Sequence, residues 1–67
     1  MTLTPVRSSN VAAVGHDGRD LTVEFKDGAR YRYVNVPRST HAALMHAPSI
    51  GSYLTTVIIP NHKAEKL

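Results

Sequence analysis

Residues 21–33 read LTVEFKDGARYRY and decide the fold. On either side of the central Lys-Asp-Gly, apolar and polar residues alternate, as they do in strands that are half-buried in a sheet. The turn-forming residues between the two runs predict an antiparallel hairpin. Its apolar faces consist of Leu21, Val23 and Phe25 on the first strand and of Tyr31 and Tyr33 on the second.

The length of the turn sets which side chains oppose one another. A two-residue turn of Asp27 and Gly28 would place Phe25 opposite Arg30 and mix an apolar face with a charged one. A half-buried sheet excludes this slip, because a shift by one residue moves every side chain to the other face. A three-residue turn over residues 26–28, with Gly28 in the left-handed conformation, makes both faces consistent. This register predicts the pairs Val23 with Tyr31, Leu21 with Tyr33, Glu24 with Arg30, and Thr22 with Arg32.

Two further patterns flank this hairpin. Residues 11–14 form a short apolar run, and the turn-forming residues 15–20 that follow favour a strand over a helix. Downstream, Pro37 suits a first helical position. The sequence predicts a short helix over residues 38–47, which Pro48 ends.

A second helix is predicted from residue 50 onward. Ser49 suits its N-cap, and Pro60 is expected to end it. Apolar residues at spacings of three and four form one stripe along it: Ile50, Tyr53, Leu54, Val57 and Ile58. The predicted fold class is α+β, a three-stranded antiparallel β-meander followed by two short helices packed on one face.

The chain has 67 residues, so we expect one domain over 1–67, with residues 1–7 and 61–67 as mobile ends. It contains no cysteine, and no disulfide can stabilise its marginal core. One sheet face is too narrow to bury the whole apolar stripe together with Ile59. We therefore expect a homo-oligomer, in the first place a dimer, with Ile50 and Ile59 at its interface.

The residue types give little sign of chemistry. His41 and His46 are five residues apart, a spacing that does not place two metal ligands on one face of a helix, and the serines lie in no nucleophile motif. We expect no enzyme activity, no metal and no cofactor. No apolar run approaches the length of a membrane span, and residues 1–5 lack the regions of a signal peptide, so we expect a cytoplasmic protein.

The order of several short motifs resembles the KTSC domain family. This resemblance implies a small domain of the kind found at the C-terminus of some lysyl-tRNA synthetases and as free-standing bacterial and phage proteins, for which RNA binding is a suggested role. It places the protein in a bacterium or a phage-infected host cell. The motifs are Ser8-Ser9-Asn10, Gly15-His16-Asp17, Phe25-Lys26-Asp27-Gly28, Tyr31-Arg32-Tyr33, Val36-Pro37, Ala47, Ser49 and Gly51.

This chain departs from the family pattern at a few positions. The family commonly has a lysine at Ile50 and an arginine at Ile59, and a tyrosine near His16 and His62. If the basic residues contact phosphate in relatives, that contact is absent here. The two isoleucines instead suit a protein–protein contact.

Three groups of residues are candidates for ligand binding. Each has a plain structural alternative: cap and turn chemistry for the polar segments, a solvated face for the arginines, and core packing for the tyrosines. If the N-terminal segment lies over the second helix, the first and third groups form one polar pocket. The groups are the N-terminal segment Arg7, Ser8, Ser9 and Asn10; the hairpin residues Arg30, Tyr31, Arg32 and Tyr33; and the helix start Ser49 and Gly51.

Three functions fit these features. The first is a noncatalytic module that binds RNA or a nucleotide, which the net charge of +3 and the arginine face favour. The first alternative is a phage-encoded oligomeric anti-defence protein that sequesters a host nucleotide signal or blocks a host protein. The second alternative is a plain protein-interaction or assembly module.

Overall fold

The predicted hairpin forms the centre of the sheet. In the computed structural model, which describes residues 3–67, β3 (Leu21–Phe25) pairs antiparallel with β4 (Arg30–Tyr33). The register is the predicted one: Val23 lies opposite Tyr31, and the other three pairs also agree. Gly28 has a φ of 96°, the left-handed conformation that the three-residue turn requires. The parity of one hairpin was therefore enough to determine the register.

β2 (Val11–His16) lies on the other side of β3 and completes the predicted meander. Its register shifts between Val11 and Ala13, so that Val11 pairs with Phe25 and Val14 pairs with Val23. Because of this bulge, Val11 and Val14 both face the core although they are three residues apart.

The sheet has five strands, where the sequence analysis expects three. β1 (Thr4–Pro5) pairs with β2, and β5 (Ala64–Lys66) pairs with β4, which gives the order β1-β2-β3-β4-β5. Both segments expected to be mobile ends thus contribute an edge strand; Met1 and Thr2, the first residues of that expected lead-in, lie outside the described residues. Both edge strands are exposed, and so lack the apolar alternation that marks a half-buried strand.

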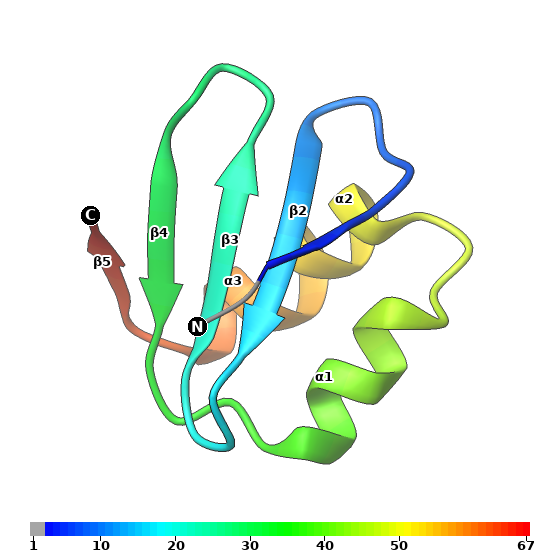
Figure 1. Cartoon of the computed structure of the whole chain (residues 1–67). Coiled ribbons are helices and arrows are strands. Elements are labelled where there is room, and N and C mark those ends of the chain that lie inside the picture. The colour runs from blue at the N-terminus through cyan, green and yellow to red at the C-terminus, as the bar shows by residue number, and fades with distance from the viewer. Residues whose placement is uncertain (1–2) are drawn as a thin grey trace.

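The helices lie together on one side of the sheet (Figure 1). α1 (Arg38–Met45) forms close to where it was predicted. The second helix, residues 50–61, consists of α2 (Ile50–Tyr53), the π-helical segment η1 (Leu54–Ile58) and α3 (Ile59–Asn61) in direct succession. Among residues 3–67, none of the helices combines the length and the apolar character needed to cross a membrane.

The π-helical segment explains how the second helix buries its apolar residues. Ile50, Leu54 and Ile58 follow one another at intervals of four, and each such step in an α-helix rotates the side chain by about 40° away from the previous one. A π turn holds more residues and takes up this drift, so all three side chains stay on the core side. Pro60 also favours the wider turn, because it has no N–H and its ring would crowd the carbonyl of Thr56 in a regular α-helix.

Two expectations for the second helix need correction. Pro60 does not end it, because the widened turn accommodates the ring and α3 runs to Asn61. Ile50 is only 8% exposed and belongs to the core, so it is not part of the surplus apolar surface that the sequence analysis expects. Leu54 is buried as predicted, at 2% exposure, whereas Tyr53 is only half-buried. Ile59 is 46% exposed, which leaves it on the surface.

Candidate functional site

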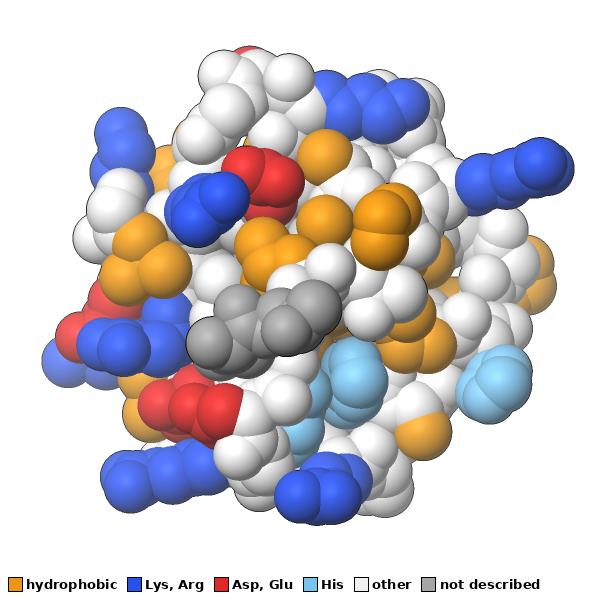
Figure 2. Space-filling view, viewed as in Figure 1, with side chains coloured by type: hydrophobic (Ala, Val, Ile, Leu, Met, Phe, Trp, Pro, Cys, Tyr) orange, Lys and Arg blue, Asp and Glu red, His pale blue; other side chains and the backbone are white. Residues whose placement is uncertain are grey.

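The two arginines of the sheet face are each paired with a carboxylate. The Nε of Arg30 lies 3.0 Å from a carboxylate oxygen of Glu24, the cross-strand partner predicted for it. Arg32 pairs with Glu65 of β5 at 2.9 Å. In Figure 2, which views the sheet from the side opposite the helices, the Lys and Arg side chains are spread around the rim and apolar side chains lie near the centre. This face therefore lacks the dense basic patch of a phosphate-binding surface.

The two tyrosines of the Y-x-Y motif lie on the core side of the sheet. Tyr33 is 3% exposed, and its burial, with a smaller effect from Tyr31, raises the pKa of its phenol. Tyr31 is half-buried and meets Phe25 edge-on, with ring centroids 5.8 Å apart at 82°. Tyr33 is thus a core residue, and the pair does not form an open stacking platform.

The N-terminal segment does lie against the start of the second helix. A Cβ at Gly51 would be 2.7 Å from the Oδ1 of Asn10 and 3.5 Å from the Oγ of Ser8. The Ser8 hydroxyl donates to that same Oδ1 at 3.1 Å. A side chain at position 51 would therefore force the Asn10 amide, which Ser8 holds, to move. We call Ser8, Asn10 and Gly51 the polar junction, which brings together residues from two of the three predicted groups.

The remaining residues of the N-terminal segment do not join the polar junction. Arg7 is exposed, and within residues 3–67 it forms no ion pair. Ser9 instead lines an open hollow of about 370 Å³ together with Asn10, Phe25, Lys26 and Asp27. Because Asp27 accompanies Lys26 there, this hollow carries no excess of positive charge.

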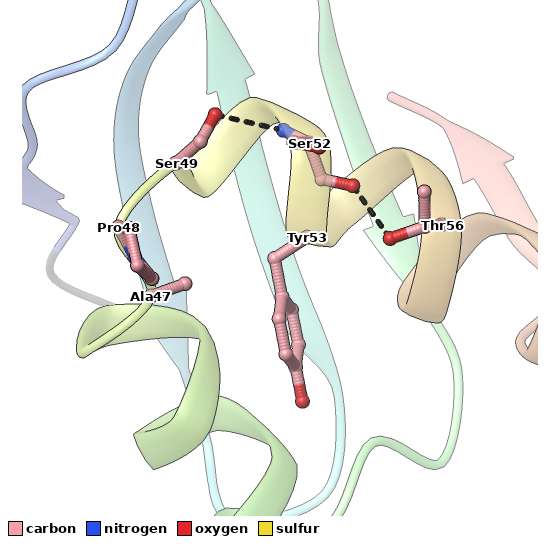
Figure 3. Close-up of a pocket in the computed structure, with 6 residues that line it drawn as sticks. All are labelled: Ala47, Pro48, Ser49, Ser52, Tyr53 and Thr56. Atoms are coloured by element: carbon pink, nitrogen blue, oxygen red, sulfur yellow. Dashed lines mark hydrogen bonds between the residues drawn. The ribbon is translucent and has the colours of Figure 1, made fainter.

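A second hollow, of about 290 Å³, lies between the end of α1 and the second helix (Figure 3). The Tyr53 ring extends from the second helix along one side of it, with the hydroxyl at the far end. No charged side chain lines it. We call it the Tyr53 hollow; its lining residues are Ala47, Pro48, Ser49, Ser52, Tyr53 and Thr56.

Some hydroxyls of the Tyr53 hollow are hydrogen-bonded within the protein, and others can still donate. Ser49 caps the helix by accepting from the backbone N–H of Ser52 at 3.3 Å, which leaves its own O–H free to donate. Thr56 donates to the carbonyl of Ser52 at 2.8 Å. Within residues 3–67, the hydroxyls of Ser52 and Tyr53 make no hydrogen bond, so three hydroxyl donors are available to a ligand.

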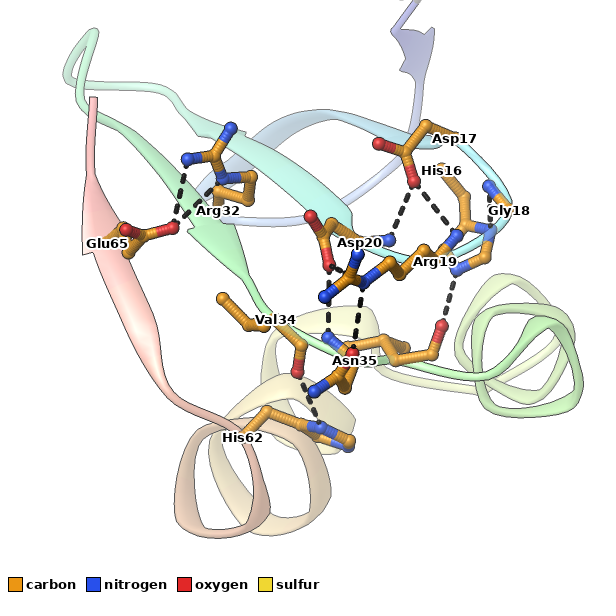
Figure 4. A network of polar contacts seen from close by, with 11 residues as sticks. His16, Asp17, Gly18, Arg19, Asp20, Arg32, Val34, Asn35, His62 and Glu65 are labelled. Atoms are coloured by element: carbon orange, nitrogen blue, oxygen red, sulfur yellow. Dashed lines mark hydrogen bonds and ion pairs between the residues drawn. The ribbon is translucent and has the colours of Figure 1, made fainter.

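His16 and His62 hydrogen-bond to backbone carbonyls of the segment that connects β4 to α1. A ring nitrogen of His16 lies 2.6 Å from the carbonyl oxygen of Val36, and one of His62 lies 3.2 Å from that of Val34 (Figure 4). Asn35, which lies between Val34 and Val36 in the chain, has a φ of 57°, and its N–H donates to Asp20 at 3.1 Å. Within the described part of the chain, no cluster of His, Cys, Asp or Glu could hold a metal ion.

Asp17 orders the turn before β3. Its carboxylate accepts the backbone N–H groups of Asp20 and Arg19 at 2.7 and 2.9 Å. These two hydrogen bonds lower the pKa of Asp17, and the bond from Asp20 has the larger effect. This acid therefore has the structural role that is usual for aspartate in turns.

Sequence reasoning did not find the Tyr53 hollow. The spacing assigned Tyr53 to the core stripe, and Ser52 and Thr56 carried no signal beyond helix polarity. Only Ser49, as a predicted cap, pointed to this part of the surface. The hollow forms where the linker after α1 meets the second helix, and no periodicity within one helix reports that meeting.

Comparisons with known proteins agree with this architecture. The KTSC domain model matches residues 7–62. An uncharacterized protein of Stutzerimonas stutzeri is 38% identical over 64 residues, which cover 92% of this chain and 90% of that protein. A protein of Tsukamurella paurometabola is 33% identical over 67 residues, covering 97% of this chain and 100% of that one.

A solved structure is also similar. The crystal structure of a KTSC domain protein from Yersinia pestis superposes with a TM-score of 0.90 at 32% identity, over 98% of this chain and 96% of that one. The match of the family model covers most of the chain, and the similarity of the fold extends nearly from end to end. The chain belongs to the KTSC domain family.

Proposed function

We propose that this protein is a noncatalytic binding module that takes a nucleobase, of a nucleotide or of an unpaired RNA residue, in the Tyr53 hollow. The observation that carries the proposal is the half-buried Tyr53, whose ring lines the hollow and whose hydroxyl has no partner among the described residues. A planar base stacks on an aromatic ring, and such stacking contributes about 1–3 kcal/mol per base.

The lining of the hollow favours the base over the phosphate. The hydroxyls of Ser49, Ser52 and Tyr53 can donate to the acceptor atoms on a base edge. No lysine or arginine lines the hollow to neutralise a phosphate. The volume of about 290 Å³ lies near the lower end of small-molecule pockets, which suits one ring system and not a whole dinucleotide.

The hairpin face is less suited to bind the ligand than the Tyr53 hollow is. Arg30 and Arg32 are already paired with Glu24 and Glu65, so a phosphate must first displace a carboxylate. Tyr33 is buried and offers no ring face. The module therefore binds through its helical side.

The test compares two half-buried tyrosines. In Tyr53→Leu the leucine keeps apolar bulk against the core but removes the ring and the hydroxyl; Tyr31→Leu is the matched control. The four ribonucleoside monophosphates and a short unpaired RNA are titrated into isotope-labelled protein and followed by NMR. We expect Tyr53→Leu to weaken binding about tenfold or more, because stacking is lost. Tyr31→Leu should bind like the wild type.

Salt dependence gives a second measure of the same site. Affinity for a mononucleotide should change by less than about tenfold from about 50 mM to about 200 mM salt, whereas a surface with many phosphate contacts loses about a thousandfold or more. Loss of binding in Tyr31→Leu but not in Tyr53→Leu would contradict the proposal. So would chemical-shift changes centred on Arg30 and Arg32.

Self-association through the second helix is a second candidate function. Ile59 favours it, because it is a large apolar side chain that is 46% exposed. A dimer with one Tyr53 hollow in each copy also suits the sequestering role that the sequence analysis names as an alternative. Sedimentation should show a species larger than 7.3 kDa, and Ile59→Arg should dissociate it. A wild type that sediments as a monomer at all concentrations would exclude this function.

A further inference from the structure

The imidazole of His16 uses both of its nitrogens. Its Nε2 lies 2.6 Å from the carbonyl oxygen of Val36, which can only accept, so this nitrogen carries the hydrogen. Its Nδ1 lies 3.1 Å from the backbone nitrogen of Gly18, which can only donate, so this nitrogen carries the lone pair. The two bonds together require the neutral ring with the proton on Nε2.

His41 of α1 stacks on this ring. The ring centroids are 4.9 Å apart, and the planes differ by only 8°. His41 is one of the α1 residues that reach the turn after β2, because its ring covers the ring of His16, which is hydrogen-bonded to Gly18 of that turn and to Val36. Nothing in the sequence announces this pair, since the two residues are far apart along the chain.

The charged groups around the pair act in opposite directions. The Arg38 guanidinium lies beside the turn, with Nη2 3.2 Å from the position that a Cβ of Gly18 would take, and it disfavours a second positive charge nearby. Asp17 is the acid next to His16, and its carboxylate already accepts two backbone N–H groups. Asp20 accepts from Asn35 and lies 4.0 Å from Arg19, and His46 is exposed farther along α1.

We infer that the stacked His16–His41 pair is a pH-sensitive latch, which holds α1 against the turn after β2 when both rings are neutral and releases α1 when they take up protons. A proton on the Nδ1 of His16 removes the acceptor for the Gly18 N–H. Two N–H donors then face each other where a hydrogen bond was. A proton on each ring also places two like charges in parallel contact.

The latch acts on one wall of the Tyr53 hollow. Ala47 and Pro48, which line the hollow, directly follow α1 in the chain. Release of α1 therefore moves this wall and opens the hollow. This last step rests on the proposed function, whereas the latch itself stands on the geometry of the two histidines.

The direction of the effect follows from His41. Burial, and secondly the nearby His16, lower the pKa of His41 below its ordinary value of about 6.5. The stability that the neutral ring contributes is thus complete above about pH 6.5 and is lost as the pH falls toward the folded pKa. The latch is closed at neutral pH and opens in mild acid.

The test uses the free protein and needs no ligand. Nitrogen-15 spectra of the histidine rings should show His16 as the Nε2–H tautomer above neutral pH and His41 with a midpoint below about 6.5. From about pH 7.5 to about pH 5, after correction for intrinsic rates, amide exchange in α1 and at Gly18 should rise about fivefold or more. His41→Phe keeps a stacked ring without a titratable charge, and the rise in α1 should fall below about twofold.

His46→Gln is the matched control, because His46 is an exposed histidine of the same segment, and it should behave like the wild type. An Nδ1–H tautomer of His16, a midpoint of His41 at or above about 6.5, or exchange in α1 that does not change with pH would each overturn the latch. All three readouts use the wild type alone, so they remain valid if His41→Phe fails to fold. Absence of nucleotide binding at Tyr53 would overturn the proposed function and leave the latch standing.

Discussion

The outer face of the sheet and the Tyr53 hollow present opposite kinds of surface. On the sheet face the sequence shows conspicuous arginines, and the fold pairs them with Glu24 and Glu65. In the hollow the sequence shows ordinary helix residues, and among residues 3–67 the hydroxyls of Ser52 and Tyr53 make no hydrogen bond. Conspicuous charge in a sequence therefore does not by itself indicate a free charged surface, because a neighbouring strand can neutralise it.

The largest expected effect is a loss of stability at Leu54, in the core, compared with Tyr53, in the hollow on the same helix. Tyr53 and Leu54 are adjacent, but only Leu54 is fully buried. Leu54→Ala should lower the free energy of unfolding by about 2–5 kcal/mol, because it leaves a cavity in a small core. Denaturant unfolding measures this loss, and Tyr53→Leu serves as the comparison, with a smaller loss of stability. Equal losses in the two variants would show that Tyr53 is as much a core residue as Leu54.

A smaller effect is expected at the polar junction. Gly51→Ala should destabilise the protein by about 1–3 kcal/mol, because the new methyl group meets the Oδ1 of Asn10. Asn10→Ala in the same chain should recover part of this loss. Thermal unfolding of the single and double variants measures the coupling between the two positions.

Gly28→Ala is the control for this coupling. Gly28 has a φ of 96° and no atom within 4 Å of a Cβ, so its substitution strains the backbone without a clash. Asn10→Ala should not relieve it. A Gly51→Ala protein as stable as the wild type would show that the N-terminal segment moves away from the second helix at little cost.

The smallest expected effect is on the sheet face. Glu65→Gln releases Arg32 from an exposed pair, and the free energy of unfolding should change by about 1 kcal/mol or less. RNA binding should not change, because neither Arg32 nor Glu65 lines the Tyr53 hollow. If affinity for RNA instead increases and falls steeply with salt, the arginine face is the binding surface and the comparison is reversed.

The extent of sequence-based prediction differs between the fold and the site. The hairpin register, the positive φ of Gly28, both helices and the burial of Leu54 followed from local patterns. The two edge strands did not, because an exposed strand of two or three residues has no apolar alternation to reveal it. Ile50 was misplaced for a different reason: its burial depends on a π-helical segment that changes the helical period.

The sequence by itself determined the meander and the apolar stripe of the second helix, because alternation and helical spacing are properties of neighbouring residues. Only the tertiary structure decided that Asn10 meets Gly51, that His16 stacks on His41, and that Glu65 neutralises Arg32. Each of these contacts joins residues that are distant along the chain. Their partners are selected by how the sheet and the helices pack, and no period within one element carries that information.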